Sequence, residues 1–417
     1  MNKENTLILD VHERPSSYLK WFLLSLQHVF GMFSATILVP LLTGLDTGVA
    51  LVASGAGTLL YIIITKRRVP IYLGSSFAYI AAIAFALEEG GQGSVFTALM
   101  GVGLVYMVVS LILKFTGSDW INRFLPPVVI GPVIMVIGLS LASVAIDSLG
   151  IGSVAGEGLL IGVVTFLAAA FIALKGKGFI KIIPFMLAIF IGYGFAVLRG
   201  SVDLAQAFEG VRLLRVPEFT FIGNYALDYS MLPMFLPLAF VTLAEHIGDH
   251  KVLGEVTNKD FLENPGLKRT VMGDGVATFV SAMIGGPANT SYGENTGIIA
   301  MNRVASVAVI TLAAAIAIIL GFSGHVQAFI LSIPSGIIGG ITIILYGVIA
   351  VNGIKILVRS NTDMGDARNL IIMSVILVIG LGGAVIEINE ITSISGMALA
   401  ATAGIVLNMF LPKHLTA

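Results

Sequence analysis

Residues 72–87 read YLGSSFAYIAAIAFAL, an apolar stretch that is too short and too broken to cross a bilayer as a plain helix. A crossing helix needs roughly 20 apolar residues. Here small and β-prone residues, YLGSS, come before a helix-like stretch, FAYIAAIA. Extended backbone at membrane depth must face protein or a wet cavity, because lipid cannot satisfy its polar groups. The stretch therefore predicts a crossing that begins as a strand and continues as a short helix.

A second stretch, PANTSYGENTGIIAM at residues 287–301, has the same order of features. Small and β-prone residues, NTSYG, are followed by the helix-like ENTGIIAM. The N-terminal amides of both short helices are expected to point into a cavity, where they donate to carbonyl oxygens or attract negative charge. The alternative interpretation is that both stretches are Gly-kinked helices.

The composition around these stretches is that of a membrane protein. Hydrophobic residues make up 57% of the chain, charged residues only 11%, and the mean hydropathy is +0.98. Soluble domains carry about 25% charged residues. The apolar runs are long and continuous, unlike the alternating segments of a membrane barrel. We therefore expect an all-α polytopic membrane protein. The absence of cysteine excludes disulfides and thiolate metal sites, and a net charge of −1 argues against nucleic acid as a partner.

Twelve further runs are long enough to span a membrane, which gives fourteen crossing segments with the two broken stretches. These runs are 21–43, 47–65, 93–114, 125–147, 157–174, 180–198, 231–256, 271–286, 304–322, 326–352, 370–386 and 394–411. With the N-terminus inside, all Lys and Arg residues except Arg199, Arg212 and Arg215 fall on the inner side. The positive-inside rule favours this arrangement, so both termini are expected in the cytoplasm.

The two broken stretches are the third and the tenth predicted crossings, which are corresponding places in two halves of seven. Because seven is odd, the two halves must have opposite orientations in the membrane. The sequence thus predicts a 7+7 inverted repeat with unwound or β stretches in segments 3 and 10. Paired interrupted segments of this kind mark the binding site of many transporters.

Acidic residues occur at membrane depth in AEHIGDH, residues 244–250. Glu245 lies about 21 Å along the eighth predicted crossing at 1.5 Å per residue. An ionised acid at the bilayer centre costs roughly 2.5–3.5 kcal/mol on insertion scales, so Glu245 is expected to be protonated, paired or facing a polar cavity. Asp249 is one turn further on the same face. Two neighbouring acids repel each other when both are ionised, which favours a proton-responsive site.

Two other interpretations of this segment remain. The first is a solvated helix end, which applies best to His250 and Lys251 and also to Asp249. The second is a metal site formed by His246 and His250 at zinc-like spacing. No third ligand is evident and the HExxH order is absent, so no metal is expected.

Three more polar residues are candidates for the same region. Glu294 stands at the predicted strand-to-helix junction of the tenth crossing, where we expect a ligand-binding or proton-carrying role. His28 lies inside the first span, either in a structural hydrogen bond to a crossing helix or in a functional role. Tyr346 lies in the twelfth span, and a lone tyrosine there is more typical of packing.

These groups favour one kind of ligand. Carboxylates accept N–H bonds and free backbone amides donate to C=O groups, so a small, neutral, planar molecule with alternating N–H and C=O groups fits. An anion would need fixed positive charge, and no Lys or Arg is predicted at membrane depth. A simple cation remains possible on chemistry alone.

The assembled motifs resemble the nucleobase/ascorbate transporter family and, within it, the proton-coupled uracil permeases. The resemblance extends over nearly the whole chain. Its motifs are SLQH (25–28), PIYLGSSFA (70–78), AEHIGDH (244–250), NTSYGENTGIIAMNRV (289–304) and LYGVIAVNGIKIL (345–357).

The resemblance implies a core domain that moves against a gate domain, commonly in a homodimer in the inner membrane. Segments 1–4 (residues 1–115) and 8–11 (231–322) would form the core. Segments 5–7 (116–200) and 12–14 (323–417) would form the gate, with 201–230 as an extracytoplasmic loop.

The resemblance also implies roles for single residues. Glu245 matches a glutamate that bonds the base, and Glu294 matches one implicated in binding and proton coupling. Phe77 and Gly293 match positions whose backbone amides meet base oxygens.

His28 and Tyr346 match polar positions near the pocket. Uracil permeases have His where this chain has Asp249, and purine-transporting relatives often have Asp there. Glu294, however, stands where those purine transporters typically carry an amide.

The resemblance therefore implies proton-coupled symport of uracil, with Glu245, Asp249, Glu294 and His28 as the proton-coupling candidates and no cofactor. The alternatives are a xanthine or uric acid permease and an anion transporter of the same architecture. An enzyme is disfavoured, because no nucleophile–base pair is evident.

Overall fold

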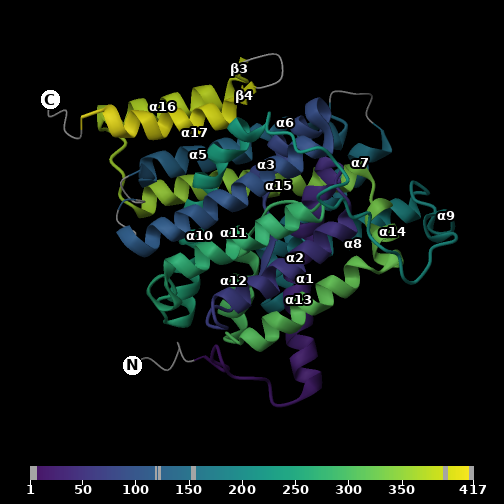
Figure 1. Cartoon of the computed structure of the whole chain (residues 1–417). Helices are drawn as coiled ribbons and strands as arrows, with labels where there is room; N and C mark the ends of the chain where they lie inside the picture. Colours follow the sequence, from purple (N-terminus) through teal and green to yellow (C-terminus); the bar gives the residue numbers. More distant parts are fainter. Residues whose placement is uncertain (1–6, 118–119, 121–123, 152–155, 388–392, 413–417) are drawn as a thin grey trace.

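The structure is a computed structural model that describes residues 7–117, 120, 124–151, 156–387 and 393–412. The described part is built almost wholly of helices packed side by side, which confirms the expected all-α class (Figure 1). Residues 1–6 of the predicted first core part and 413–417 of the predicted second gate part lie outside the described residues. The same is true of residues 118–119, 121–123, 152–155 and 388–392.

The first half of the chain forms the elements α1 (Tyr18–Thr43), α2 (Thr47–Ile64), β1 (Leu73–Ser75), η2 (Phe77–Tyr79), α3 (Ile80–Thr116), α5 (Pro127–Ser140), α6 (Ala142–Leu149), α7 (Glu157–Lys175), η3 (Gly178–Ile182) and α8 (Pro184–Leu198). Gly91, at φ 71° and ψ −166°, interrupts α3 and divides it into two helical parts. The first part, together with β1 and η2, falls on the predicted third crossing (72–87), and the second part falls on the predicted fourth crossing (93–114).

The second half forms α9 (Leu204–Phe208), α10 (Leu232–Thr257), η4 (Leu262–Gly266), α11 (Leu267–Met283), β2 (Asn289–Ser291), α12 (Gly293–Asn302), α13 (Val307–Gly321), α14 (Gly324–Leu331), α15 (Ser335–Arg359), α16 (Ala367–Leu381), β3 (Val385–Glu387), β4 (Ser393–Ser395) and α17 (Gly396–Phe410). In Figure 1, α9 and α14 lie next to each other at the right-hand edge of the molecule.

Many of these helices are suited to a bilayer. Within the described residues, 6 helical stretches are long and apolar enough to cross a membrane, and the shorter helices α8, α13, α16 and α17 are also apolar. The protein is therefore a multi-pass membrane protein.

The predicted span 326–352 is wrong. Its first part belongs to α14, which ends at Leu331, and α15 begins only at Ser335 with Pro334 as its N-cap residue. Proline has no N–H and disfavours helical backbone in the residue before it, which favours a break between the two helices at this point. The predicted span 125–147 corresponds to one helical stretch of membrane length, Pro127–Leu149, with a local break at Leu141 between α5 and α6.

Buried apolar side chains form two main clusters. One cluster joins α3, α5, α10, α16 and α17, and the other joins α1, α2, α8, α13 and α15. Each cluster combines helices of the predicted core with helices of the predicted gate, so apolar packing connects the two parts in both clusters.

Both broken stretches begin as short strands, so the interpretation as Gly-kinked helices is wrong. β1 and β2 pair in antiparallel fashion near the middle of the molecule. The register places Leu73 opposite Ser291, Gly74 opposite Thr290 and Ser75 opposite Asn289. The pairing satisfies backbone groups that lipid could not satisfy.

A threonine on a neighbouring helix bonds the first residue of each strand. Thr58 of α2 accepts from the N–H of Leu73 at 2.9 Å and donates to its C=O at 3.2 Å. Thr278 of α11 accepts from the N–H of Asn289 at 3.2 Å and donates to its C=O at 3.0 Å. The two strands are thus held in the same way by two separate helices.

Gly74 is required by the close approach of Tyr292. The Tyr292 hydroxyl donates to the C=O of Ser75 at 2.9 Å. A Cβ at Gly74 would lie 2.4 Å from atoms of the Tyr292 ring. The ring is buried and its hydroxyl is bonded, so it has little freedom to move away.

We expect Gly74→Ala to destabilise the protein by about 1–3 kcal/mol, because the added methyl group overpacks the strand pair. Thermal unfolding in detergent measures the effect. Gly158→Ala is the matched control, because a Cβ at Gly158 meets no atom within 4 Å. Equal melting temperatures for the two variants would contradict the steric argument.

Candidate functional site

Three acidic side chains from two helices meet beside the strand pair. Glu245 and Asp249 lie one turn apart on α10, and Glu294 lies in the first turn of α12. Their charges are close enough to interact. A Cβ built at Gly293 would lie 3.9 Å from Oδ1 of Asp249. All three acids are partly buried, and none forms an ion pair within the described residues.

Two helix starts lie at the ends of the two strands. η2 begins at Phe77 after β1, and α12 begins at Gly293 after β2. The N-cap residues, Ser76 and Tyr292, provide no side-chain bond to the first turn. The first N–H groups of a helix have no partner inside it, so both starts present backbone donors. The predicted roles of Phe77 and Gly293 in binding remain predictions.

Several buried hydroxyl groups around the strands have no hydrogen-bond partner within the described chain. They belong to Ser76, Thr290, Ser291, Thr296 and Tyr346. Buried polar groups in proteins are nearly always hydrogen-bonded. This region therefore contains more polar groups than the chain itself satisfies, as expected of a polar ligand site.

Tyr346 of α15 is buried against the same apolar cluster as Ile80, with Phe77 packed at its edge. Its ring thus fills a packing role, as the sequence suggested, while its hydroxyl has no partner. α15 therefore brings Tyr346 beside η2, close to the start of α3.

Glycines leave room next to the polar groups. Gly248 on α10, Gly293 on α12 and Gly347 on α15 are exposed, although each adjoins a buried or partly buried polar residue. A Cβ at Gly248 or Gly347 would meet no atom within 4 Å. Open space therefore borders all three helices.

His28 of α1 is fully buried and is bonded to Asn295 of α12. The side-chain amide of Asn295 donates to Nδ1 of His28 and also to its backbone C=O, both at 3.1 Å. The structural hydrogen bond considered from the sequence is therefore present. A proton-coupling role for His28 remains a prediction.

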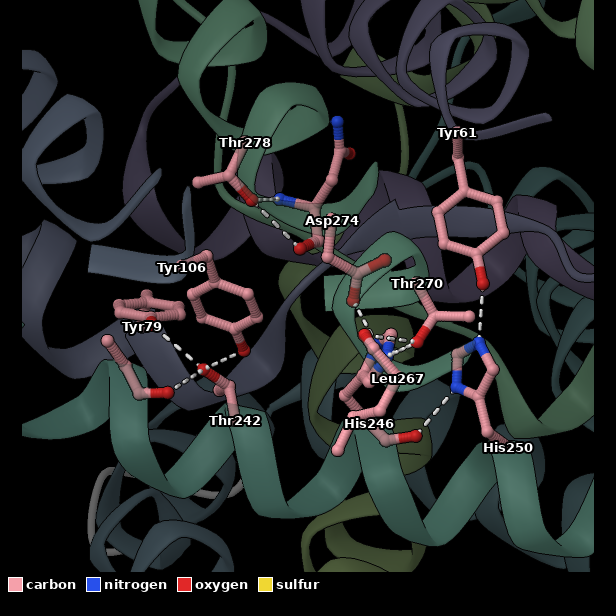
Figure 2. A network of polar contacts seen from close by, with 12 residues as sticks. Tyr61, Tyr79, Tyr106, Thr242, His246, His250, Leu267, Thr270, Asp274 and Thr278 are labelled. Atoms are coloured by element: carbon pink, nitrogen blue, oxygen red, sulfur yellow. Dashed lines mark hydrogen bonds and ion pairs between the residues drawn. The ribbon is translucent and has the colours of Figure 1, made fainter. Parts of the chain in front are cut away.

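A second polar network lies along α10, with side chains that reach α11 and α2 (Figure 2). His246 bonds Asp274 of α11 through Nδ1 at 2.7 Å, and it bonds the hydroxyl of Thr270 through Nε2 at 2.9 Å. Both His246 and Asp274 are buried. Sequence reasoning missed Asp274. Its signal was an acid inside the otherwise apolar run 271–286.

The expectation that His250 is solvated is wrong. α10 continues to Thr257, and His250 is fully buried. Its Nε2 is bonded to the hydroxyl of Tyr61 on α2, and its Nδ1 to the C=O of His246 at 2.7 Å. All ring nitrogens of the two histidines are thus engaged. No group of three possible metal ligands occurs in the described part of the chain, so this geometry does not support the alternative of a metal site.

Thr242, one turn before His246, extends the network. Hydroxyl groups of Tyr79 and Tyr106 lie 3.0 Å and 2.8 Å from Oγ1 of Thr242 (Figure 2). These bonds tie α10 to η2 and α3. Together the two parts of the network fix the face of α10 that lies away from the space beside Gly248.

Comparison with known proteins identifies the family. Residues 19–388 match the family model Xan_ur_permease, which is described as a permease family. The chain belongs to this family. The permease is therefore a transporter and not an enzyme, and the resemblance seen in its motifs is confirmed.

Similar curated proteins are uracil permeases. That of Bacillus caldolyticus is 46% identical over 98% of this chain and 95% of its own length. Those of Bacillus subtilis (strain 168) and Escherichia coli (strain K12) are 44% and 37% identical, over 97% and 96% of this chain and 95% and 93% of their own lengths.

Solved structures with a similar fold are more distant in sequence. The transmembrane domain of the cyanobacterial bicarbonate transporter BicA has a TM-score of 0.60 at 14% identity, covering 95% of this chain and 99% of that domain. SLC26A9 has a TM-score of 0.68 at 11% identity, covering 95% of this chain and 66% of its own. These likenesses concern the fold alone.

We expect His246→Leu to lower the stability of the permease by about 1–3 kcal/mol, because it leaves the buried carboxyl group of Asp274 without its hydrogen-bond partner. Thermal unfolding in detergent measures this change. The double variant His246→Leu/Asp274→Leu removes the unsatisfied carboxyl group as well and should recover part of the loss. A single variant as stable as the unaltered protein would contradict the pairing argument.

Proposed function

We propose that this permease takes up uracil together with protons by alternating access. The observation that carries the proposal is the meeting of Glu245, Asp249 and Glu294 with the uncapped starts of η2 and α12. Uracil is neutral and planar, with N–H and C=O groups in alternation. Carboxylates would accept from its N–H groups, and backbone amides would donate to its oxygens.

In the proposed complex Glu245 and Glu294 bond the base from α10 and α12. The backbone amides of Phe77 and Gly293 face its oxygens, and the unpaired hydroxyl of Tyr346 adds a polar group from α15. Full-length likeness to proteins named uracil permease supports this base as the substrate.

Proton coupling is assigned to the same acids. Three carboxyl groups close together cannot all be ionised without strong repulsion. When the base binds and covers them, at least one carboxyl group would therefore hold a proton, and that proton would be carried with the base. Asp249 and His28 lie beside the two glutamates in this scheme. The proton is the coupling ion, and no further cofactor enters the proposal.

We propose that the fold contains fourteen crossings as a 7+7 inverted repeat. The equivalent bonds from Thr58 to β1 and from Thr278 to β2 support it, because inverted halves place corresponding helices beside corresponding strands. Core parts 1–115 and 231–322 would move against gate parts 116–200 and 323–417, in a homodimer. Residues 201–230 form the outer loop.

Two alternatives differ in substrate. A xanthine or uric acid permease is favoured by Asp249, which stands where uracil permeases have His. An anion transporter is favoured only by the fold. It is disfavoured because the three acids form no ion pair with a basic residue in the described part of the chain, so the site offers no positive side chain to bind an anion.

Uptake of labelled uracil into proteoliposomes with an inward proton gradient tests the proposal. We expect accumulation that collapses with an uncoupler and is lost in Glu294→Gln, because glutamine binds no exchangeable proton at this position. Glu255→Gln on the exposed end of α10 is the control. Uptake in Glu294→Gln at the unaltered level would refute the role.

Competitors in the same assay separate the alternatives. Excess unlabelled uracil should abolish the signal and excess xanthine should not. Stronger competition by xanthine would establish the purine alternative, and flux that depends on bicarbonate or chloride and ignores uracil would establish the anion transporter.

We propose that the protein lies in the inner membrane with both termini in the cytoplasm. The chain contains no cysteine, so single cysteines can be labelled without background. We expect Lys177→Cys to react with an impermeant maleimide only after the cells are opened. Arg212→Cys should react in intact cells, and the reverse pattern would invert the topology.

A further inference from the structure

A groove of about 440 Å³ lies outside the candidate site, between the N-terminal segment (residues 7–17), α1, α2 and α13. Figure 1 shows this segment approaching the start of α1 at the edge of the molecule. The lining has a basic part and an apolar part. The basic part consists of His12, Arg14 and Arg67, and the apolar part includes Leu59, Ile62 and Ile63.

The N-terminal segment is fixed in place beside α13. Leu9 pairs with Val304 in a parallel bridge. The N–H of Ala305 donates to the C=O of Leu9 at 2.9 Å, and that of Val307 donates to the C=O of Val11 at 3.0 Å. The segment is therefore a wall of the groove and not a loose tail.

The positive charge in the groove is not neutralised by the protein. Neither Arg14 nor Arg67 forms an ion pair within the described residues. Of the nearby acids, Asp10 pairs with Lys259 at 3.0 Å. The carboxylate of Glu13 accepts from the N–H of Asp10 at 2.8 Å, forms no ion pair with either arginine and does not line the groove. The groove thus presents a basic pocket.

The apolar part of the groove continues into a lipid-facing surface. Ile63 is 66% exposed, and Leu19 on the first turn of α1 is 69% exposed. Trp21 lines the groove, and its indole N–H donates to the C=O of Ala308 at 2.9 Å. The guanidinium of Arg14 lies 5.9 Å from the centroid of the Trp21 ring. Tryptophan at such a boundary is typical of the membrane–water interface.

We propose that this groove binds an anionic phospholipid of the adjacent leaflet. Arg14 and Arg67 bind the phosphate, and an acyl chain lies along Leu59 and Ile63. Basic pockets between helices at the membrane surface recognise anionic head groups in this way. A lipid with a net negative charge is preferred over a zwitterionic one, because the groove supplies no acid for a head-group cation.

The bound lipid links the N-terminal segment to the end of α2. This link matters for the candidate site, because α2 carries Thr58, which bonds the start of β1. Anionic lipid is therefore expected to raise the thermal stability of the permease. The proposal does not depend on the identity of the transported molecule.

Native mass spectrometry of the full-length protein tests the proposal, with titration by phosphatidylglycerol and by phosphatidylcholine of the same chains. We expect Arg14→Gln/Arg67→Gln to weaken phosphatidylglycerol binding about tenfold or more. The reason is that each basic group near the head group contributes about 1 kcal/mol to binding, and about 1.4 kcal/mol corresponds to a tenfold change in affinity. Phosphatidylcholine binding should change much less, because its choline cation offsets the phosphate charge that the arginines attract. Lys177→Gln, which removes an exposed basic residue outside the groove, is the matched control.

A conservative variant separates charge from folding. Arg14→Lys/Arg67→Lys keeps the charge and should retain most of the preference for phosphatidylglycerol. Unchanged phosphatidylglycerol binding by the glutamine variant would overturn the proposal. Displacement of the lipid by an equal concentration of inorganic phosphate would also overturn it, since the site would then serve a soluble anion.

Discussion

The structure depends on how backbone groups are satisfied where two crossings are unwound. A strand in the middle of a bilayer has polar groups that lipid cannot bond, and each unpaired group costs several kcal/mol. Here β1 and β2 bond each other, and Thr58 and Thr278 bond the first residue of each strand. Neither strand would be stable without the other, although more than 200 residues of chain lie between them.

This pairing also determines where the chemistry lies. Because each strand ends where a helix begins, the pairing brings the starts of η2 and α12 together. Glu294 then lies within one turn of a helix start, and α10 runs past with Glu245 and Asp249. On its other face α10 is fixed by Thr242, His246 and His250, whose bonds reach α2, α3 and α11 (Figure 2). A rigid support on one face and open space on the other is what a site of defined geometry requires.

Features written in local sequence could be predicted, and features that depend on distant partners could not. The small residues before each short helix indicated the strands. The acid in the apolar run of α10 indicated a candidate site, whose role remains a prediction. The space needed by Tyr292 beside Gly74 and the pairing of Asp274 with His246 involve residues far apart in the chain. His250 was misinterpreted because its partner, Tyr61, lies on another helix. The missed break before α15 was a local signal, since Pro334 was visible in the sequence.

The fold by itself does not decide what is carried. It is shared with a bicarbonate transporter at 14% identity, and two facing helix starts on their own would attract an anion through their backbone dipoles. In this chain Glu294 occupies the first turn of α12, and Glu245 and Asp249 lie opposite. Any of these acids that is ionised would repel an anion at these helix starts, and none of them forms an ion pair in the described residues. Under the proposed function, the same helix starts would donate to neutral carbonyl oxygens and the acids would accept from N–H groups. Side chains added to a common backbone would then change the class of ligand.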